Sequence, residues 1–252
     1  GTVVIGGNAQ VLRNSALRGD GGSGGGIWSS GTLTLTGSAA ARGNLIRNNT
    51  SSTNAAFGGG IYSAGTLTIA ENAEVTGNSI TNSGANGGGV YAAGGSVTLR
   101  DNAKITGNSI LNATSMMRGC GVFIANSTTL SVSGAVQVTG NRDSYGTSAN
   151  VLLSGTDSVN PITVIGALNG ASIGVRVPGS VLDTIDDTHT VTIATAATEG
   201  WIADDSFTGD NDEYPLRTNA DGKTAQLCNH IHTWMYTTSE EDTADGETAY
   251  TI

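Results

Sequence analysis

A stretch of about thirty residues recurs along the chain, and this repeat restricts the fold more than any other feature. Residues 58–79, GGGIYSAGTLTIAENAEVTGNS, return as residues 87–109, GGGVYAAGGSVTLRDNAKITGNS. Two motifs mark each unit: an aliphatic residue three positions before an asparagine, and Gly-x-Gly followed by Ile or Val. The asparagines, spaced by 34, 30, 30 and 33 residues, are Asn14, Asn48, Asn78, Asn108 and Asn141. The second motif ends at Ile27, Ile61, Val90 and Val122.

The spacing between copies changes in the same way for both motifs. One structural unit is therefore repeated, with loops of variable length. We place the four extra residues of the first interval in GSAAARGN, residues 37–44.

Apolar and polar residues alternate inside each unit, as at Leu67 and Ile69 or at Val97 and Leu99. A period of two is typical of a half-buried β-strand, and no window shows a sustained helical period. Each unit is therefore expected to form three short strands, such as GIYSA, TLTIA and AEVTG within residues 60–77. One coil cannot bury its apolar face alone, whereas stacked coils form a continuous core. The sequence thus predicts an all-β fold, a right-handed single-stranded parallel β-helix of about six coils with a C-terminal β cap.

The asparagine of each unit is expected to have a structural role. Its side chain can bond to the asparagine one coil away, and a buried amide without partners is costly. The glycines permit corners at which the backbone needs a positive φ. We therefore predict a ladder of stacked asparagines formed by Asn14, Asn48, Asn78, Asn108 and Asn141.

The repeat pattern weakens after about residue 149, and this change divides the chain into three regions. Residues 1–177 are expected to form the β-helix. Residues 178–227 are expected to cap its last open edge, with a hairpin around Asp221-Gly222, because exposed strand edges invite aggregation. Residues 228–252 differ in composition and are expected to be a tail or the start of a following module.

Charge and hydropathy argue against two classes of partner. The 252 residues carry a formal net charge of −10 and their 11 basic residues form no block, so we expect no nucleic-acid partner. No apolar run approaches the length of about 18 residues that a membrane span needs, so we expect no membrane insertion. The chain begins within the repeat pattern and without a methionine, and we expect it to be part of a larger polypeptide.

Both motifs resemble those of the polymorphic outer membrane proteins of chlamydiae, which repeat Gly-Gly-Ala-Ile/Leu/Val and Phe-x-x-Asn along a β-helical, surface-exposed region. Here the first motif stands as GGGI, GGGI, GGGV and GCGV, and the second as VLRN, LIRN, VTGN, ITGN and VTGN. The chain also looks like β-helical stretches of large surface proteins from gut Gram-positive bacteria. The resemblance covers about residues 1–150, with glycine in place of the family's alanine and an aliphatic residue in place of its phenylalanine. It implies an extracellular adhesin or stalk segment at the bacterial cell surface, with a host glycan or surface protein as its partner.

An aromatic residue follows each Gly-x-Gly-aliphatic motif, and alternation directs these side chains away from the core. They are predicted to form an outer ladder that stacks on sugar rings or docks a partner, unless the loops after each asparagine cover it. The ladder consists of Trp28, Tyr62, Tyr91 and Phe123.

Outward positions of the next strand form a Thr-x-Thr array similar to the surface of ice-binding solenoids, although threonine is favoured in strands generally. The array consists of Thr32, Thr34, Thr66, Thr68, Ser96, Thr98, Thr129 and Ser131.

Carboxylates suggest two further hypotheses, an enzyme and a calcium site. Parallel β-helices include lyases and hydrolases that act on polysaccharides, and glycoside hydrolysis needs two carboxylates facing one cleft. Glu71 and Asp101 occupy equivalent corners of adjacent coils, but nearby basic residues favour a surface pair, and we expect no catalytic residue. Residues 204–213 could bind Ca²⁺ or form a solvated acidic turn, since they lack the ligand order of an EF-hand. The candidate ligands are Asp204, Asp205, Asp210 and Asp212; otherwise no cofactor is expected.

Overall fold

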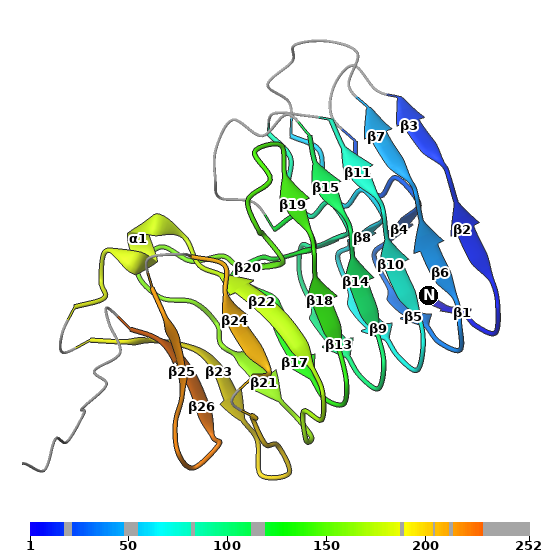
Figure 1. The fold of residues 1–252 in the computed structure, drawn as a ribbon. Helices are drawn as coiled ribbons and strands as arrows, with labels where there is room; N and C mark the ends of the chain where they lie inside the picture. The colour runs from blue at the N-terminus through cyan, green and yellow to red at the C-terminus, as the bar shows by residue number, and fades with distance from the viewer. Residues whose placement is uncertain are drawn as a thin grey trace, which may run out of the picture.

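The computed structural model of the protein describes residues 1–17, 22–47, 55–81, 84–111, 119–186, 189–203, 205–211 and 214–228. Its short strands stack in parallel into a solenoid, and its coils follow one another along a single axis (Figure 1). The described residues contain one short helix, α1 (Gly179–Leu182). The predicted all-β parallel β-helix is thereby confirmed.

Two sheets form the main body of the solenoid. The first contains β1 (Thr2–Ile5), β5 (Thr32–Leu35), β9 (Thr66–Ile69), β13 (Ser96–Leu99), β17 (Thr129–Val132), β21 (Ile162–Val164), β23 (Val191–Ala196), β26 (Thr224–Leu227) and β25 (Leu216–Thr218). One arm of the second contains β2 (Gln10–Leu12), β6 (Ala40–Arg42), β10 (Glu74–Thr76), β14 (Lys104–Thr106) and β18 (Gln137–Thr139). Its other arm contains β4 (Ile27–Ser29), β8 (Ile61–Ser63), β12 (Val90–Ala92), β16 (Val122–Ile124) and β20 (Val151–Leu153). Both arms meet at β22 (Ser172–Arg176), which also pairs with β24 (Phe207–Gly209).

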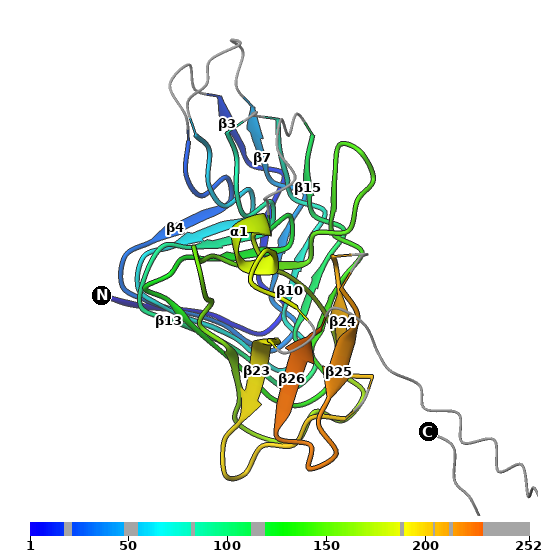
Figure 2. The ribbon, with the colours of Figure 1, turned by 90° about the vertical axis from the view of Figure 1, so that its left-hand side faces the viewer.

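A short fourth strand follows the asparagine in each of the first five coils, beyond the three strands that the sequence predicts. These strands are β3 (Ser15–Leu17), β7 (Leu45–Arg47), β11 (Ser79–Ile80), β15 (Ser109–Ile110) and β19 (Arg142–Asp143). They form a lobe that projects from the main body of the solenoid (Figure 2). The lobe has a small apolar core of its own, to which Ile46, Ile80 and Ile110 contribute fully buried side chains. Each of the first five coils therefore contributes to two cores.

Equivalent apolar residues stack on one another inside the main body. Leu33 pairs with Leu67, which in turn pairs with Val97, and all three side chains are almost completely buried. Because successive coils place apolar side chains at the same inward positions, the core continues along the axis without a break. Stacking of this kind buries apolar area that no single coil could cover.

The register of the second coil places its four extra residues elsewhere than predicted. Ala41 pairs with Val11 and with Val75, so residues 37–44 contain an ordinary strand, β6, and no lengthened turn. The extra residues fall after β7, since Arg47 pairs with Leu17 while Phe57 pairs with Ser23, an advance of ten positions instead of six. An insertion between two stacked strands leaves their register unchanged, whereas an insertion inside a strand would shift it.

Parallel pairing continues past residue 177 before the chain reverses. Strand β23 pairs in parallel with β21, and β24 pairs in parallel with β22. The antiparallel strands β26 and β25 then form a hairpin around Asp221-Gly222 on the edge of β23, and Gly222 has a φ of 63°. No helix in the described part of the chain is long and apolar enough to cross a membrane.

Candidate recognition surface

The four predicted aromatic side chains stack on one outer side of the solenoid. Each lies at the centre of its strand, and in-register pairing of β4, β8, β12 and β16 places each ring beside the next. Successive ring centroids are 6.0, 5.5 and 4.9 Å apart, and the ring planes differ by 2°, 8° and 5°. We call this row the aromatic ladder, formed by Trp28, Tyr62, Tyr91 and Phe123.

Stacking determines which part of the aromatic ladder a ligand can reach. Nearly parallel rings cover one another's faces, so the half-buried Tyr62 and Tyr91 present mainly their edges to solvent. Trp28 differs, because its side chain is 58% exposed and no other ring of the described residues lies against its second face. At the opposite end Phe123 pairs with the buried Leu152, and the row of rings stops there. The ladder therefore offers one open ring face and a strip of ring edges.

A fifth ring, which the sequence analysis missed, lies beside the aromatic ladder. The centroid of Phe57 is 4.5 Å from that of Tyr91, with the planes tilted by 41°. Phe57 belongs to the segment that returns from the lobe, where single bridges pair it with Ser23 and Asn86. This position directly precedes the glycine motif but differs in residue type from coil to coil, so the repeat does not mark it. Burial, followed by the charge of Tyr62, raises the pKa of Tyr91.

The asparagine ladder forms, with Asn44 in place of the predicted Asn48 and with Asn150 as an additional member. From Asn44 onward, the Oδ1 atom of each member accepts the backbone N–H and the Nδ2–H of the preceding member, at 2.9 to 3.0 Å. Its members are Asn14, Asn44, Asn78, Asn108, Asn141 and Asn150. Asn48 lies outside the described residues, and Asn44 holds the second position because it follows β6. Its buried amide is bonded on both sides, as a structural role requires.

The two repeat motifs contact each other within each coil. A β-carbon on the third glycine of the Gly-x-Gly motif would lie 2.7 or 2.8 Å from the Nδ2 atom of the ladder asparagine. The glycine–asparagine pairs are Gly26 with Asn44, Gly60 with Asn78, Gly89 with Asn108, and Gly121 with Asn141. No side chain fits at these positions, because Cβ contacts below 3.0 Å force neighbouring atoms to move. The glycine is therefore a packing partner of the buried amide.

Threonine and serine side chains form two columns along the outer face of the first sheet. One column runs through Thr2, Thr32, Thr66, Ser96 and Thr129. The second runs through Val4, Thr34, Thr68, Thr98, Ser131, Thr163 and Thr195. The predicted array is therefore in register across the coils, and Val4 is the one position of these two columns without a hydroxyl group.

Glu71 and Asp101 lie at equivalent corners, but their carboxylates accept hydrogen bonds from backbone N–H groups. Glu71 Oε2 accepts a hydrogen bond from Gly37 N at 2.8 Å, and Asp101 Oδ2 accepts one from Glu71 N at 3.0 Å. The same oxygen of Asp101 also pairs with Arg100 Nη1 at 2.6 Å. Both acidic residues adopt positive φ values, 57° and 61°, at a corner where Gly37 does so too. Each carboxylate thus bonds to the preceding coil, and this arrangement differs from two acids facing one cleft.

Of the four candidate calcium ligands, the structure describes Asp205 and Asp210. Asp210 is buried, and its two carboxylate oxygens accept the backbone N–H and the Nδ2–H of Asn150 at 2.6 and 3.0 Å. Asp205 is exposed, whereas Asp204 and Asp212 lie outside the described residues. No group of three potential metal ligands occurs among the residues that the structure describes. Asp210 therefore ends the asparagine ladder, a role that the sequence analysis did not assign to it.

Comparisons with known protein families, with curated proteins and with solved structures find no match for this chain. Inference about its function therefore starts from its own surfaces.

Proposed function

We propose that the chain is an adhesin segment of a bacterial surface protein, an elongated β-helix that contacts a host glycan or surface protein through the aromatic ladder. One observation carries this proposal: the indole of Trp28 is 58% exposed at the end of a stack of parallel rings. Aromatic side chains contribute strongly to interfaces, and an exposed row of them is unusual on a protein without partners. The solenoid supplies the rigid support that holds the rings in line.

The ring geometry specifies how each kind of partner would bind. A sugar ring needs a free aromatic face, so a glycan would stack on Trp28 and contact only the edges of Tyr62 and Tyr91. A protein partner would cover the whole strip of edges together with Phe57. Replacement of Trp28 should therefore abolish glycan binding, whereas a protein interface should also depend on the inner rings.

A glycan array tests the first mode with three proteins: the wild type, Trp28→Ala and Tyr145→Ala. Tyr145 is a matched control, because its side chain is 72% exposed and it lies outside the ladder. Binding that is lost in Trp28→Ala and kept in Tyr145→Ala supports the proposal. Equal binding by all three proteins would refute a role for the ladder.

Adhesion to epithelial cells tests the second mode, with protease-treated and glycosidase-treated cells as comparisons. A protein partner predicts adhesion that protease treatment removes and that a Trp28→Ala, Tyr62→Ala, Tyr91→Ala triple variant lacks. Circular dichroism of the variant establishes that its fold is intact. If the wild type binds neither glycans nor cells, the adhesin proposal fails, and a spacer role takes its place.

The hydroxyl array on the first sheet favours ice binding as a second candidate function. Its members repeat about every 4.8 Å between coils and about every 6.7 Å along a strand, so the array could order surface water regularly. Thermal hysteresis of freezing is the direct test, with Thr98→Lys as the disrupting variant and Thr76→Lys as the control on another side of the solenoid. Absence of hysteresis in the wild type removes this candidate.

For a polysaccharide-active enzyme no observation provides comparable support, because the carboxylates of Glu71 and Asp101 accept hydrogen bonds from backbone N–H groups.

A further inference from the structure

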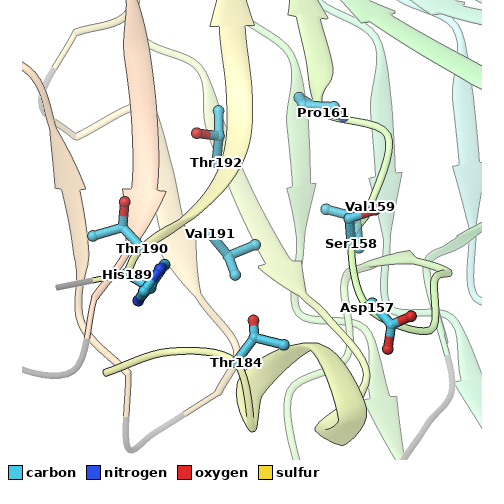
Figure 3. Close-up of a pocket in the computed structure, with 9 residues that line it drawn as sticks. All are labelled: Asp157, Ser158, Val159, Pro161, Thr184, His189, Thr190, Val191 and Thr192. Atoms are coloured by element: carbon cyan, nitrogen blue, oxygen red, sulfur yellow. The ribbon is translucent and has the colours of Figure 1, made fainter. Parts of the chain in front are cut away.

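A cavity of about 380 Å³ lies where the last coils meet the cap, and its lining includes no residue of the aromatic ladder (Figure 3). Three segments line it: the turn between β20 and β21, the residue Thr184 that follows α1, and the start of β23. Its volume falls within the range of small-molecule sites, about 300 to 1,000 Å³, and near the lower end. The cavity is therefore too small for a folded partner and suits a compact ligand.

The floor of this junction pocket is aliphatic and its rim is polar. Val159 and Val191 are half-buried, pack against the main core, and face the cavity from opposite sides in Figure 3. Ser158, Thr184 and Thr190 line the pocket and are exposed, so their hydroxyl groups are accessible to a ligand. The combination suits a ligand with one apolar face and hydroxyl groups around its perimeter.

The charges around the pocket argue against anionic ligands. None of the described lining residues is Lys or Arg, so a phosphate or carboxylate would find no fixed cation there. Asp157 lies on the rim, and His189 on the opposite side pairs with Asp186 at 3.1 Å. The lining contains no Phe, Tyr or Trp among its described residues, so a nucleobase would lack a stacking partner. These observations disfavour anions and nucleobases, and a neutral, hydroxyl-rich molecule matches the polar rim and the aliphatic floor.

We propose that the junction pocket binds one neutral sugar unit, such as a hexose or an N-acetylhexosamine. The apolar face of the sugar ring would lie on Val159 and Val191, and its hydroxyl groups would bond to the rim. Thr184 Oγ1 already donates to Val181 O at 2.7 Å, so it would act as an acceptor from the sugar. Ser158 can donate and accept. This site is separate from the aromatic ladder and does not depend on the function proposed for it.

Saturation-transfer NMR tests the proposal with methyl glucoside, methyl galactoside and methyl N-acetylglucosaminide, and with methyl glucuronide as the charged comparison. Val159→Phe fills the pocket, whereas Ile165→Phe introduces the same side chain at an exposed position outside the pocket lining and serves as the control. We expect at least one neutral glycoside to bind, with affinity reduced tenfold or more by Val159→Phe and unchanged by Ile165→Phe. Ser158→Ala, at an exposed rim position that leaves the core intact, should weaken binding several-fold.

Three results would overturn the proposal. The first is that none of the neutral glycosides receives saturation from the protein. The second is equal binding by the wild type, Val159→Phe and Ser158→Ala, which would place the sugar elsewhere. The third is tighter binding of the glucuronide than of the glucoside, which would contradict the assignment of a neutral ligand. An unchanged affinity in Trp28→Ala separates this site from the ladder, so either proposal can fail alone.

Discussion

The asparagine ladder predicts that an Asn→Ala substitution lowers the free energy of unfolding much more inside the ladder than at an exposed position. Asn78 is completely buried and its side chain makes four hydrogen bonds. Its Oδ1 accepts from Asn44 N and Asn44 Nδ2, and its Nδ2 donates to Asn108 Oδ1 and Ala41 O, all at 2.9 to 3.0 Å. Asn78→Ala removes all four at once.

The magnitude follows from the groups that the substitution leaves behind. The buried N–H of Asn44 loses the acceptor that it has in the structure, and an unsatisfied buried group costs about 1 to 3 kcal/mol. Each further net hydrogen bond contributes about 1 kcal/mol. Asn44 Nδ2 keeps its bond to Val11 O, which limits the loss on that side. We expect Asn78→Ala to lower the free energy of unfolding by about 3 to 5 kcal/mol.

Asn102 offers a matched control, because its Nδ2 donates to Asn72 Oδ1 at 3.1 Å on the exposed surface. Solvent replaces that bond, so Asn102→Ala should cost less than about 0.5 kcal/mol. Urea unfolding followed by circular dichroism measures both, with the slope of the transition checked for constancy. Hydrogen exchange of the Asn44 amide provides a local readout that does not require two-state unfolding. Equal costs for Asn78→Ala and Asn102→Ala would refute the reasoning.

Three further predictions follow from the same coils. Gly89→Ala should lower the free energy of unfolding by about 1 to 3 kcal/mol, because its β-carbon would lie 2.8 Å from Asn108 Nδ2. Gly94→Ala should change the free energy of unfolding little, since the nearest contact of its β-carbon would be at 3.6 Å. Thermal unfolding of both variants checks this prediction. Burial raises the pKa of Tyr91, so the stability from this phenol is present below about pH 10 and is lost as the pH rises through its raised pKa. An ultraviolet absorbance titration should show that Tyr62→Phe lowers this pKa in part, and no change would contradict the contribution of Tyr62. Asp210→Asn should cost about 1 to 3 kcal/mol, because the amide that replaces the carboxylate brings a buried Nδ2–H group that needs an acceptor at the end of the ladder; equal urea midpoints for wild type and variant would exclude this.

The repeat predicted the strand order, the inward residues and the aromatic ladder because these depend on periodicity alone. It misplaced the second ladder asparagine because Ala41 fills the position that Val75 and Ile105 fill in later coils. The aliphatic-x-x-Asn motif needs a larger aliphatic residue there, so in this coil it falls on Leu45, which begins the fourth strand. A better signal was a glycine directly before the asparagine. Gly43, Gly77, Gly107 and Gly140 all precede a ladder asparagine and have positive φ values.

Other features carried no signal that periodicity could detect. The fourth strands of the later coils contain only two residues, as at Ser79–Ile80, too few to show an alternation. Asn150 accepts from Asn141 only nine positions earlier, and Asp210 meets Asn150 across sixty positions. Contacts with such separations arise from the way the last coils close, which a repeat of about thirty residues does not describe.

The direction of the asparagine ladder explains why an aspartate stands at its end. Each ladder asparagine donates its backbone N–H and its Nδ2–H to the Oδ1 atom of the next member. The last member, Asn150, therefore still needs acceptors for its own N–H and Nδ2–H. Another asparagine at position 210 would bring its own Nδ2–H and would need yet another acceptor. A carboxylate only accepts, and its two oxygens receive both N–H groups of Asn150. Asp210 therefore completes the polar core of the solenoid at the coil where the stack ends.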